Sequence, residues 1–276
     1  MALGPSFASP PAPESEIVRR IAAGGPAVVA LSGGVDSGLV AALAQEALGP
    51  LAAAVTLTGT AVSVEEVEAA HALARAIGID HHVVRAEPLE NGAYRANGPE
   101  RCYHCRSVET AAVRRWAAGR GFSQYLDGVH ADDLGDDRPG LRAMDEAGFV
   151  HPLVLAGWGK AAVRAAARRR GLPNWNRPSN ACLASRVAHG EPITPELLRR
   201  IESAEAVLTA EGFRRVRVRV DAGGARLEVD PDEVARLSAE PTASRVVGRV
   251  RTIGFDPVTI DPRGYATLRG ALPVVR

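Results

Sequence analysis

The sequence predicts an α/β protein: a parallel sheet covered by helices, followed by a smaller α+β domain. Three observations support this fold class. Short apolar runs alternate with helical stretches over the first two thirds of the chain, a glycine-rich turn joins the first strand to a helix at residues 32–38, and the composition changes at residues 172–179. A chain of 276 residues is long enough for two such domains, each with its own core.

The first part of the chain has the pattern of repeated βαβ units. The runs expected to form strands are residues 27–31, 51–57, 81–85 and 124–127. The stretches expected to form helices are residues 37–48, 64–77, 104–119 and 160–170. Ser63 can cap the second helix, and Glu65 and Glu66 place negative charge in its first turn. This alternation predicts right-handed crossovers and a parallel sheet covered on both faces.

The second part of the chain reads as a small α+β domain. Thr194 can cap a helix over residues 195–211, with Pro195 at its first position and Gly212 as its stop. Arginine and valine alternate over residues 215–220, as in a half-exposed strand. The remaining elements are a hairpin partner at residues 226–229, helices at 231–237 and 242–253, and a strand at 258–260.

The domain boundaries follow from these changes of pattern. Residues 172–179 contain two prolines among polar residues, which is typical of a connector. We therefore expect a disordered tail over residues 1–15, a nucleotide domain over 16–178 and a second domain over 179–276.

Composition excludes several classes of protein. A net charge of +1 gives no basic excess for tracking nucleic-acid phosphates. No apolar run approaches the roughly 20 residues that span a bilayer, and the N-terminus has no signal-peptide pattern. Three cysteines, an odd number, indicate thiol or metal chemistry rather than a disulfide framework. We expect a cytoplasmic protein that needs neither nucleic acid nor membrane.

Residues 32–38, Ser-Gly-Gly-Val-Asp-Ser-Gly, have the pattern of an anion-binding loop. They follow the apolar run 27–31 and open a helix. Gly33 and Gly34 allow backbone angles at which several N–H groups converge. The helix that follows directs the positive end of its dipole to the same place.

The side chains of this loop suit the phosphates of ATP. Ser32 and Ser37 supply hydroxyl groups, and Asp36 can hold Mg²⁺ against phosphate oxygens. The chain has one lysine, Lys160, and Val154 stands where the first glycine of a Walker loop would be, so transfer of the γ-phosphate is not expected. The sequence predicts an ATP and Mg²⁺ site; a glycine-rich turn without a ligand is the alternative.

Two further segments carry candidate nucleotide contacts. Asp127 and Gly128 stand at the carboxyl end of a predicted strand, where parallel sheets bind their ligands. Arg138 and Arg142 are candidate clamps because guanidinium groups bind planar anions with two hydrogen bonds. An ordinary solvated loop is the alternative for this acidic stretch.

The three cysteines fall in two places. Cys102 and Cys105 are three residues apart at the start of a predicted helix, so both can face one metal ion. Cys182 lies just past the connector, and Arg186 nearby favours its thiolate form. The alternatives are incidental thiols in the first place and a buried structural cysteine in the second.

Together these residues resemble the LarE family of ATP-dependent sulfurtransferases, which are N-type ATP pyrophosphatases with a PP-loop. The resemblance extends over nearly the whole chain and rests on residues 32–37, 127–128, 137–141, 146–148, 171–176, 182–186 and 213–219. The loop alone is shared with synthetases and tRNA thiolases, whereas the Arg-Pro-Gly-Leu and Asn-Trp-Asn segments are more specific.

The resemblance implies a reaction in nickel-pincer nucleotide biosynthesis. The carboxylates of pyridinium-3,5-biscarboxylic acid mononucleotide are adenylated and then converted to thiocarboxylates. In one version the cysteine matched by Cys182 gives up its own sulfur and becomes dehydroalanine. Cys102 and Cys105 make this chain similar to members whose three cysteines hold a 4Fe-4S cluster, which can carry sulfide from an external donor. Zinc is the competing metal, with His104, His151 or His189 as the fourth ligand.

By the same match, further residues are assigned to the reacting centre. Ser185 and Arg186 would lie beside Cys182, and Glu205 and Arg217 would contact substrate or metal. The alternatives are a helix-surface acid at Glu205 and the wet face of a strand at Arg217. We also expect a homo-oligomer.

Three other functions compete with this one. A tRNA thiolase shares the loop and the paired cysteines, an amide-forming synthetase would need an ammonia source, and a nucleotide-binding sensor of ATP or iron–sulfur status would bind without releasing pyrophosphate. The low net charge argues against the first.

Overall fold

A computed structural model describes residues 11–134, 138–177 and 182–265. Its contacts divide the chain into two compact units. The first unit comprises residues 1–87 and 102–180, and the second comprises residues 88–101 and 181–276. The second boundary lies close to the expected connector, but the segment 88–101, which the sequence placed in the first domain, belongs to the second unit.

The first unit is built on a five-stranded parallel sheet, which confirms the expected fold class. The strand order is β3-β2-β1-β4-β5. The strands are β1 (Ala27–Ala30), β2 (Ala52–Thr58), β3 (Asp80–Arg85), β4 (Gln124–Leu126) and β5 (Phe149–Val150). With β1 at its centre, the sheet places the turn after β1 at the middle of its carboxyl edge.

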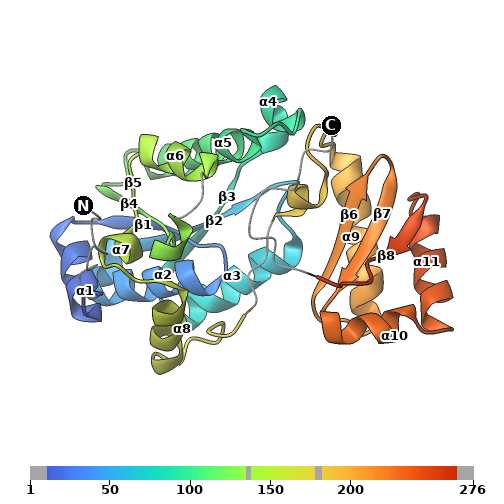
Figure 1. The fold of residues 1–276 in the computed structure, drawn as a ribbon. Helices are drawn as coiled ribbons and strands as arrows, with labels where there is room; N and C mark the ends of the chain where they lie inside the picture. The colour runs from blue at the N-terminus through green and yellow to red at the C-terminus, as the bar shows by residue number, and fades with distance from the viewer. Residues whose placement is uncertain (1–10, 135–137, 178–181, 266–276) are drawn as a thin grey trace, which may run out of the picture. The chain divides into compact units, whose positions relative to one another are not determined.

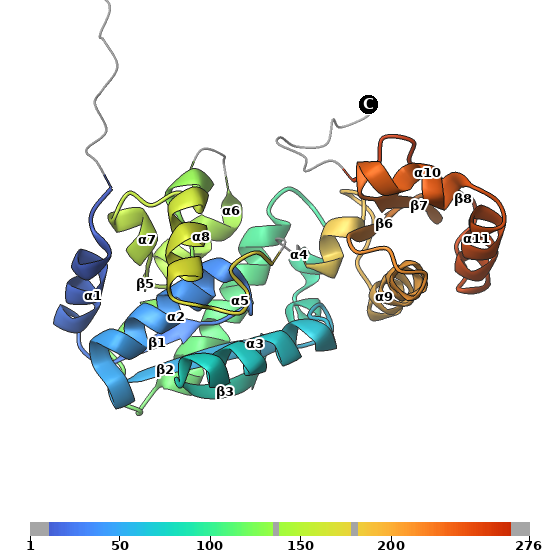
Figure 2. The ribbon, with the colours of Figure 1, turned by 90° about the horizontal axis from the view of Figure 1, so that it is seen from below.

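Helices cover both faces of this sheet (Figures 1 and 2). On one face lie α1 (Glu14–Ala23), α2 (Val35–Leu48), α3 (Val64–Ile77) and α8 (Lys160–Arg169). On the other lie α5 (Arg101–Ala117) and α6 (Pro139–Glu146). The short helices are α4 (Gly92–Arg95), in the second unit, and α7 (Pro152–Leu155), in the first.

Alternation along β1 explains the two-sided cover. Val29 packs in the cluster that contains Leu39 of α2, whereas Val28 packs in the cluster that contains Val113 of α5. Val28 and Val29 of β1 and Leu39 of α2 are fully buried. Successive side chains of a strand point to opposite faces, so an all-apolar β1 needs helices on both sides.

The first helix begins nearer to the N-terminus than the sequence predicted. The expected tail over residues 1–15 lies mostly outside the described residues, but α1 already begins at Glu14. Ile17 and Ile21 of α1 are buried one turn apart, which fixes this charged helix on the core. Trp158 Nε1 also donates a hydrogen bond to the Ala12 carbonyl at 2.7 Å.

The second unit contains a three-stranded mixed sheet in the order β6-β7-β8. Its elements are β6 (Val216–Asp221), β7 (Gly224–Val229), β8 (Val258–Ile260), α9 (Pro195–Ala210), α10 (Val234–Ser238) and α11 (Thr242–Thr252). β6 pairs antiparallel with β7, and β7 pairs parallel with β8. The valines of β6 are buried together with apolar residues of α9, whereas the alternating arginines occupy the other face.

Among the residues that the structure describes, no helix has the length and apolar character to cross a membrane.

Gly128 sets a steric limit at the carboxyl edge of the first sheet. A Cβ atom at this position would lie 2.4 Å from the Ser37 backbone nitrogen, which belongs to the first turn of α2. We predict that Gly128→Ala lowers the free energy of unfolding by about 1–3 kcal/mol, because backbone must move to relieve the overlap.

Urea unfolding measures this loss. Gly248→Ala is the matched control, since a Cβ there meets nothing within 4 Å and alanine favours the helix α11. A Gly128→Ala protein as stable as the wild type would show that the approach of this strand end to α2 is not tight.

Candidate functional site

The turn between β1 and α2 has the geometry of a phosphate loop. Gly33 has φ of +75°, which favours glycine, and a Cβ there would lie 3.0 Å from the Ala70 nitrogen of α3. Gly34 is the N-cap of α2 and provides no side-chain cap. The first N–H groups of α2 and the positive end of its dipole are therefore available to an anion.

Two hydroxyl groups bridge this turn. Ser32 Oγ and Ser37 Oγ lie 3.1 Å apart, and the Ser32 N–H donates to Ser37 Oγ at 3.1 Å. The Ser37 hydroxyl also lies 3.4 Å from the Gly34 carbonyl, to which it can donate. The structure thus brings the predicted loop residues together at one end of α2.

The Asp36 carboxylate fits the role of a metal ligand. Its Oδ2 accepts a hydrogen bond from Lys160 Nζ at 2.5 Å. Its Oδ1 is buried and has no hydrogen-bond partner in the described chain, and His130 Nε2 lies 4.0 Å away. Carboxylate oxygens are the ligands that Mg²⁺ prefers, so this donor fits the expected ion.

Lys160 is a site residue that sequence reasoning missed. In the sequence, this one lysine among 33 lysine and arginine residues served only to exclude a Walker loop. Asp132 Oδ2 accepts its backbone N–H at 2.7 Å, which fixes the start of α8. This contact holds the ammonium group beside Asp36, where phosphate charge would accumulate.

Asp127 has both carboxylate oxygens engaged. One accepts the Val129 N–H at 2.9 Å, and the other lies 2.7 Å from His151 Nδ1. Asp145 bonds the second ring nitrogen of His151 at 2.8 Å. Burial alone lowers the pKa of His151, but the hydrogen bonds and charges of the two carboxylates outweigh it and raise the pKa above its usual value. A nucleotide contact by Asp127 stays a prediction.

The two expected anion clamps contact their own neighbours. Arg138 donates to Asp133 Oδ1 at 2.7 Å. The Arg142 guanidinium lies 4.6 Å from the Tyr103 ring centre and 3.9 Å from Glu146. Neither contact tests binding to a nucleotide, so this role also stays a prediction.

The cysteines belong to different units. Cys102 is exposed and Cys105 is half-buried near the start of α5, and Cys105 Sγ lies 3.5 Å from Glu109. Cys182 is exposed in the second unit, directly before the short 3₁₀ helix Leu183–Arg186. In the parts of the chain that are described, no group of three or more histidine, cysteine or acidic side chains is placed to hold a metal. Neither the iron–sulfur cluster nor the zinc alternative gains support from this arrangement.

In the second unit, Arg186 joins the Cys182 segment to the sheet. Its guanidinium makes two bonds to the Glu205 carboxylate, at 2.8 and 3.0 Å, and donates to the Cys182 carbonyl at 3.0 Å. The same Glu205 accepts the Val218 N–H of β6 at 3.1 Å. Arg186 is 2% exposed, so this pair fixes the position of Cys182 on the second unit.

Arg217 is a buried cation that lacks an acidic partner among the described residues. It is 7% exposed, and it donates to the Val216 carbonyl at 2.7 Å. Burial and then the nearby Arg186 lower the pKa of Arg217. The charge of Glu205 offsets part of this effect, and an anionic ligand would stabilise the buried guanidinium further.

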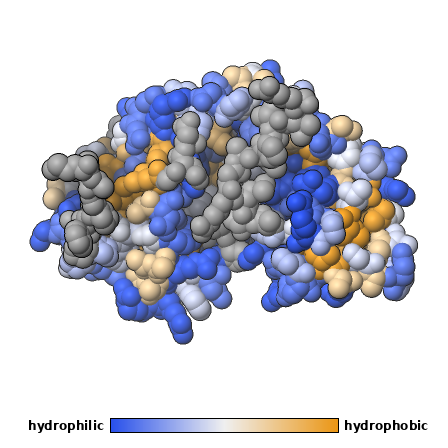
Figure 3. Space-filling model, in the orientation of Figure 1, coloured by the Kyte–Doolittle hydropathy of each residue, from blue (hydrophilic) through white to orange (hydrophobic). Residues whose placement is uncertain are grey.

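The neighbours of Arg217 are also charged. Arg219 and Arg226 share the buried Glu228, at 3.1 and 3.2 Å. In the space-filling view, hydrophilic residues gather over β6 (Figure 3). This face of the sheet in the second unit is a second candidate anion site.

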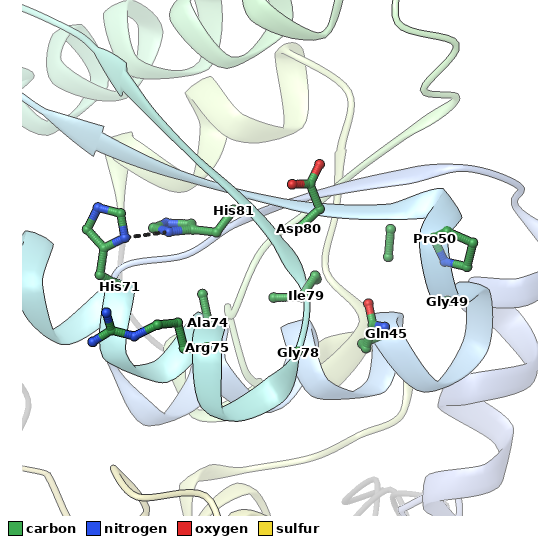
Figure 4. Close-up of a pocket in the computed structure, with 11 residues that line it drawn as sticks. Gln45, Gly49, Pro50, His71, Ala74, Arg75, Gly78, Ile79, Asp80 and His81 are labelled. Atoms are coloured by element: carbon green, nitrogen blue, oxygen red, sulfur yellow. Dashed lines mark hydrogen bonds between the residues drawn. The ribbon is translucent and has the colours of Figure 1, made fainter.

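A further hollow lies away from the loop. It has a volume of about 710 Å³ and opens at the amino ends of β2 and β3 (Figure 4). His71 and His81 line it with their Nδ1 atoms 3.2 Å apart, and burial followed by the charge of His71 lowers the pKa of His81 to about 4. Because it occupies the opposite edge of the sheet, it is not part of the candidate site.

A parallel sheet with this loop between its central strand and the first covering helix defines a PP-loop ATP pyrophosphatase. Comparison with known families agrees, since the asparagine synthase model matches residues 15–96. An NH₃-dependent NAD⁺ synthetase of Wolinella succinogenes is 44% identical over 73 residues, 26% of this chain and 28% of that one.

Two of the relatives that match over most of their length are more than 30% identical to this chain. An uncharacterized protein of Synechocystis sp. is 39% identical over 87% of this chain and 89% of its own. The pyridinium-3,5-bisthiocarboxylic acid mononucleotide synthase of Lactiplantibacillus plantarum is 32% identical over 87% of both chains. The chain therefore belongs to the PP-loop ATP pyrophosphatases, in the family that includes this synthase.

We predict that Asp36→Asn abolishes release of pyrophosphate from ATP and leaves the fold intact, because a neutral amide oxygen binds Mg²⁺ poorly. Coupled assay of pyrophosphate measures the loss, and circular dichroism checks the fold. Asp80→Asn, an exposed change at the far edge of the sheet, should release pyrophosphate at the wild-type rate. Near-normal release by folded Asp36→Asn protein would remove the assignment of the metal ligand.

Proposed function

We propose that this protein is an ATP-dependent sulfurtransferase that adenylates the carboxylates of pyridinium-3,5-biscarboxylic acid mononucleotide and converts them to thiocarboxylates. The observation that carries the proposal is the similarity to the Lactiplantibacillus plantarum synthase along 87% of both chains. The loop geometry supports the use of ATP, and the unpartnered Asp36 oxygen supports Mg²⁺. We extend the proposal to a cytoplasmic homo-oligomer that takes sulfur from sulfide or another donor.

In the first unit, the loop binds and orients the nucleotide. Bound ATP with Mg²⁺ supplies an α-phosphate that a carboxylate can attack, with pyrophosphate as the leaving group. The N–H groups at the start of α2 and the hydroxyls of Ser32 and Ser37 hold the phosphate oxygens. Asp36 holds the ion, and the Lys160 ammonium balances charge that builds up on the leaving group.

In the second unit, Arg217 holds an anionic group of the mononucleotide. The substrate carries both phosphate and carboxylate groups, and a buried guanidinium binds either through paired hydrogen bonds. Arg217 has the burial for such a contact and no acidic partner in the described chain. Glu205 positions Arg186 and through it the Cys182 segment.

Cys182 is the proposed origin or carrier of sulfur. Its exposure leaves it accessible to an acyl adenylate. Attack by its thiolate on the acyl carbon forms a thioester and releases AMP. Loss of the Cα proton and cleavage of the Cβ–S bond then leave a thiocarboxylate on the substrate and dehydroalanine in the chain.

An iron–sulfur cluster on Cys102, Cys105 and Cys182 is the other proposed route for sulfur. The described residues bring no three ligands together, so we derive no step through a cluster. Mass spectrometry before and after turnover with ATP and the mononucleotide distinguishes the routes. Loss of one H₂S from Cys182 identifies the sacrificial route, an unchanged chain with product formed identifies an external donor, and no thiocarboxylate product would refute the proposed function.

We predict that Arg217→Ala raises the KM for the mononucleotide at least about tenfold and leaves the affinity for ATP unchanged, because one charged hydrogen-bonded contact is lost. Steady-state kinetics and calorimetry with ATP separate the two effects. Arg215→Ala is the matched control, since Arg215 is more exposed and pairs with Asp230 at 3.3 Å. If Arg217→Ala lost as much affinity for ATP as for the mononucleotide, Arg217 would not be a specific contact of the mononucleotide.

We predict that anaerobic purification yields a brown protein with about four irons and four sulfides per chain, as the cluster route requires. Changing any one of the three cysteines to serine should then remove most of the bound iron, because each change removes a ligand. Iron and sulfide analysis measures this. Iron-free protein that is fully active and spent after one round would exclude the cluster and support loss of sulfur from Cys182.

A further inference from the structure

We propose that Asn174 is a positioning residue for the phosphate loop, and that its amide keeps the Gly33 carbonyl turned away from the bound phosphates. The inference rests on the proposed function only in requiring that the loop binds ATP. Asn174 belongs to the turn after α8, in a segment that the sequence identified as part of the connector and of the family resemblance, without a role for this side chain.

The amide of Asn174 is inserted behind the loop. It is 8% exposed, and its Nδ2 donates to the Gly33 carbonyl at 3.1 Å. A Cβ at Gly38 would lie 3.1 Å from the same Nδ2, so the amide occupies space that only a glycine in α2 leaves open. Its orientation is fixed, because only the NH₂ end of the amide can donate to a carbonyl.

This bond decides which way the next peptide group points. In a planar trans peptide, the Gly33 carbonyl and the Gly34 N–H point in opposite directions. Holding the carbonyl toward Asn174 therefore directs the Gly34 N–H to the other side, where Ser32 Oγ lies 3.4 Å away. Glycine on both sides of this peptide permits its rotation, so the Asn174 bond and the long contact to Ser32 Oγ restrain it.

Rotation would reverse the electrostatics of the loop. The carbonyl oxygen would then face the phosphates and repel them, in place of an N–H that attracts them. The structure holds the other end of the loop in a similar way, since Thr56 Oγ1 donates to the Leu31 carbonyl at 2.8 Å. Carbonyls on both sides of Ser32 are thus bonded by side chains from other elements.

The remaining amide oxygen indicates a functional role for Asn174. Its Oδ1 is buried without a hydrogen-bond partner in the described chain. A buried polar atom left unpaired is unfavourable for folding, so this end of the amide adds nothing to stability. A buried polar group that is only partly satisfied is typical of a functional position.

The test measures binding and stability of two variants with α,β-methylene ATP and Mg²⁺, whose α–β linkage resists cleavage. Calorimetry should show that Asn174→Leu binds at least about tenfold more weakly than the wild type, because the carbonyl is released. Its melting temperature should stay close to that of the wild type, because loss of the bond to Gly33 and removal of the unpaired Oδ1 have opposite effects on stability. Asn176→Leu, an exposed change in the same turn, should bind normally.

Asn174→Asp adds a readout that packing alone cannot produce. At about pH 8 the introduced carboxylate repels the Gly33 carbonyl, and binding should be weak. At about pH 5.5 burial favours the neutral carboxyl, whose O–H can donate to that carbonyl, so affinity relative to the wild type at the same pH should recover. Asn174→Leu should show no recovery.

Normal binding by both Asn174 variants would overturn the inference and leave the proposed function standing. Affinity that falls together with melting temperature, without recovery of Asn174→Asp at low pH, would reduce Asn174 to a packing residue. Absence of nucleotide binding by the wild type would overturn the proposed function and this inference with it.

Discussion

The backbone around the β1–α2 turn must be approached closely from three sides, and the site depends on this constraint. A side chain at Gly33 would meet α3, one at Gly38 would meet Leu73 and Asn174, and one at Gly128 would meet the first turn of α2. The loop is therefore not a flexible glycine linker. It is backbone compressed between neighbouring elements, with N–H groups at the start of α2 left for an anion.

The sheet and its principal helices were predictable from the chain because their signals are local. Buried strands read as apolar runs, and Ser63 caps α3 as expected by accepting the Glu66 N–H. β5 was missed because two residues carry no periodic pattern. α1 was missed because its charged residues hide two buried isoleucines, and the placement of residues 88–101 depends on contacts distant in sequence.

The residues of the candidate site divide in the same way, into those with a local sequence signal and those placed by contacts distant in sequence. Residues 32–38 follow one another in the chain, so their convergence was readable from the motif. Lys160 and Asn174 reach the loop from α8 and the turn after it, more than 120 residues away, and only the folded chain shows these contacts. The pairing of Arg186 with Glu205 was likewise invisible in sequence, although the family resemblance singled out both residues.

The central claim is that ATP activates a carboxylate. Oxygen labelling tests it most directly: the mononucleotide carries ¹⁸O in its carboxylates, and AMP released during turnover is examined by mass spectrometry. Because the acyl adenylate breaks between carbon and the bridging oxygen when sulfur attacks, the account predicts one ¹⁸O in each AMP. Unlabelled AMP, or ADP in place of AMP, would contradict it.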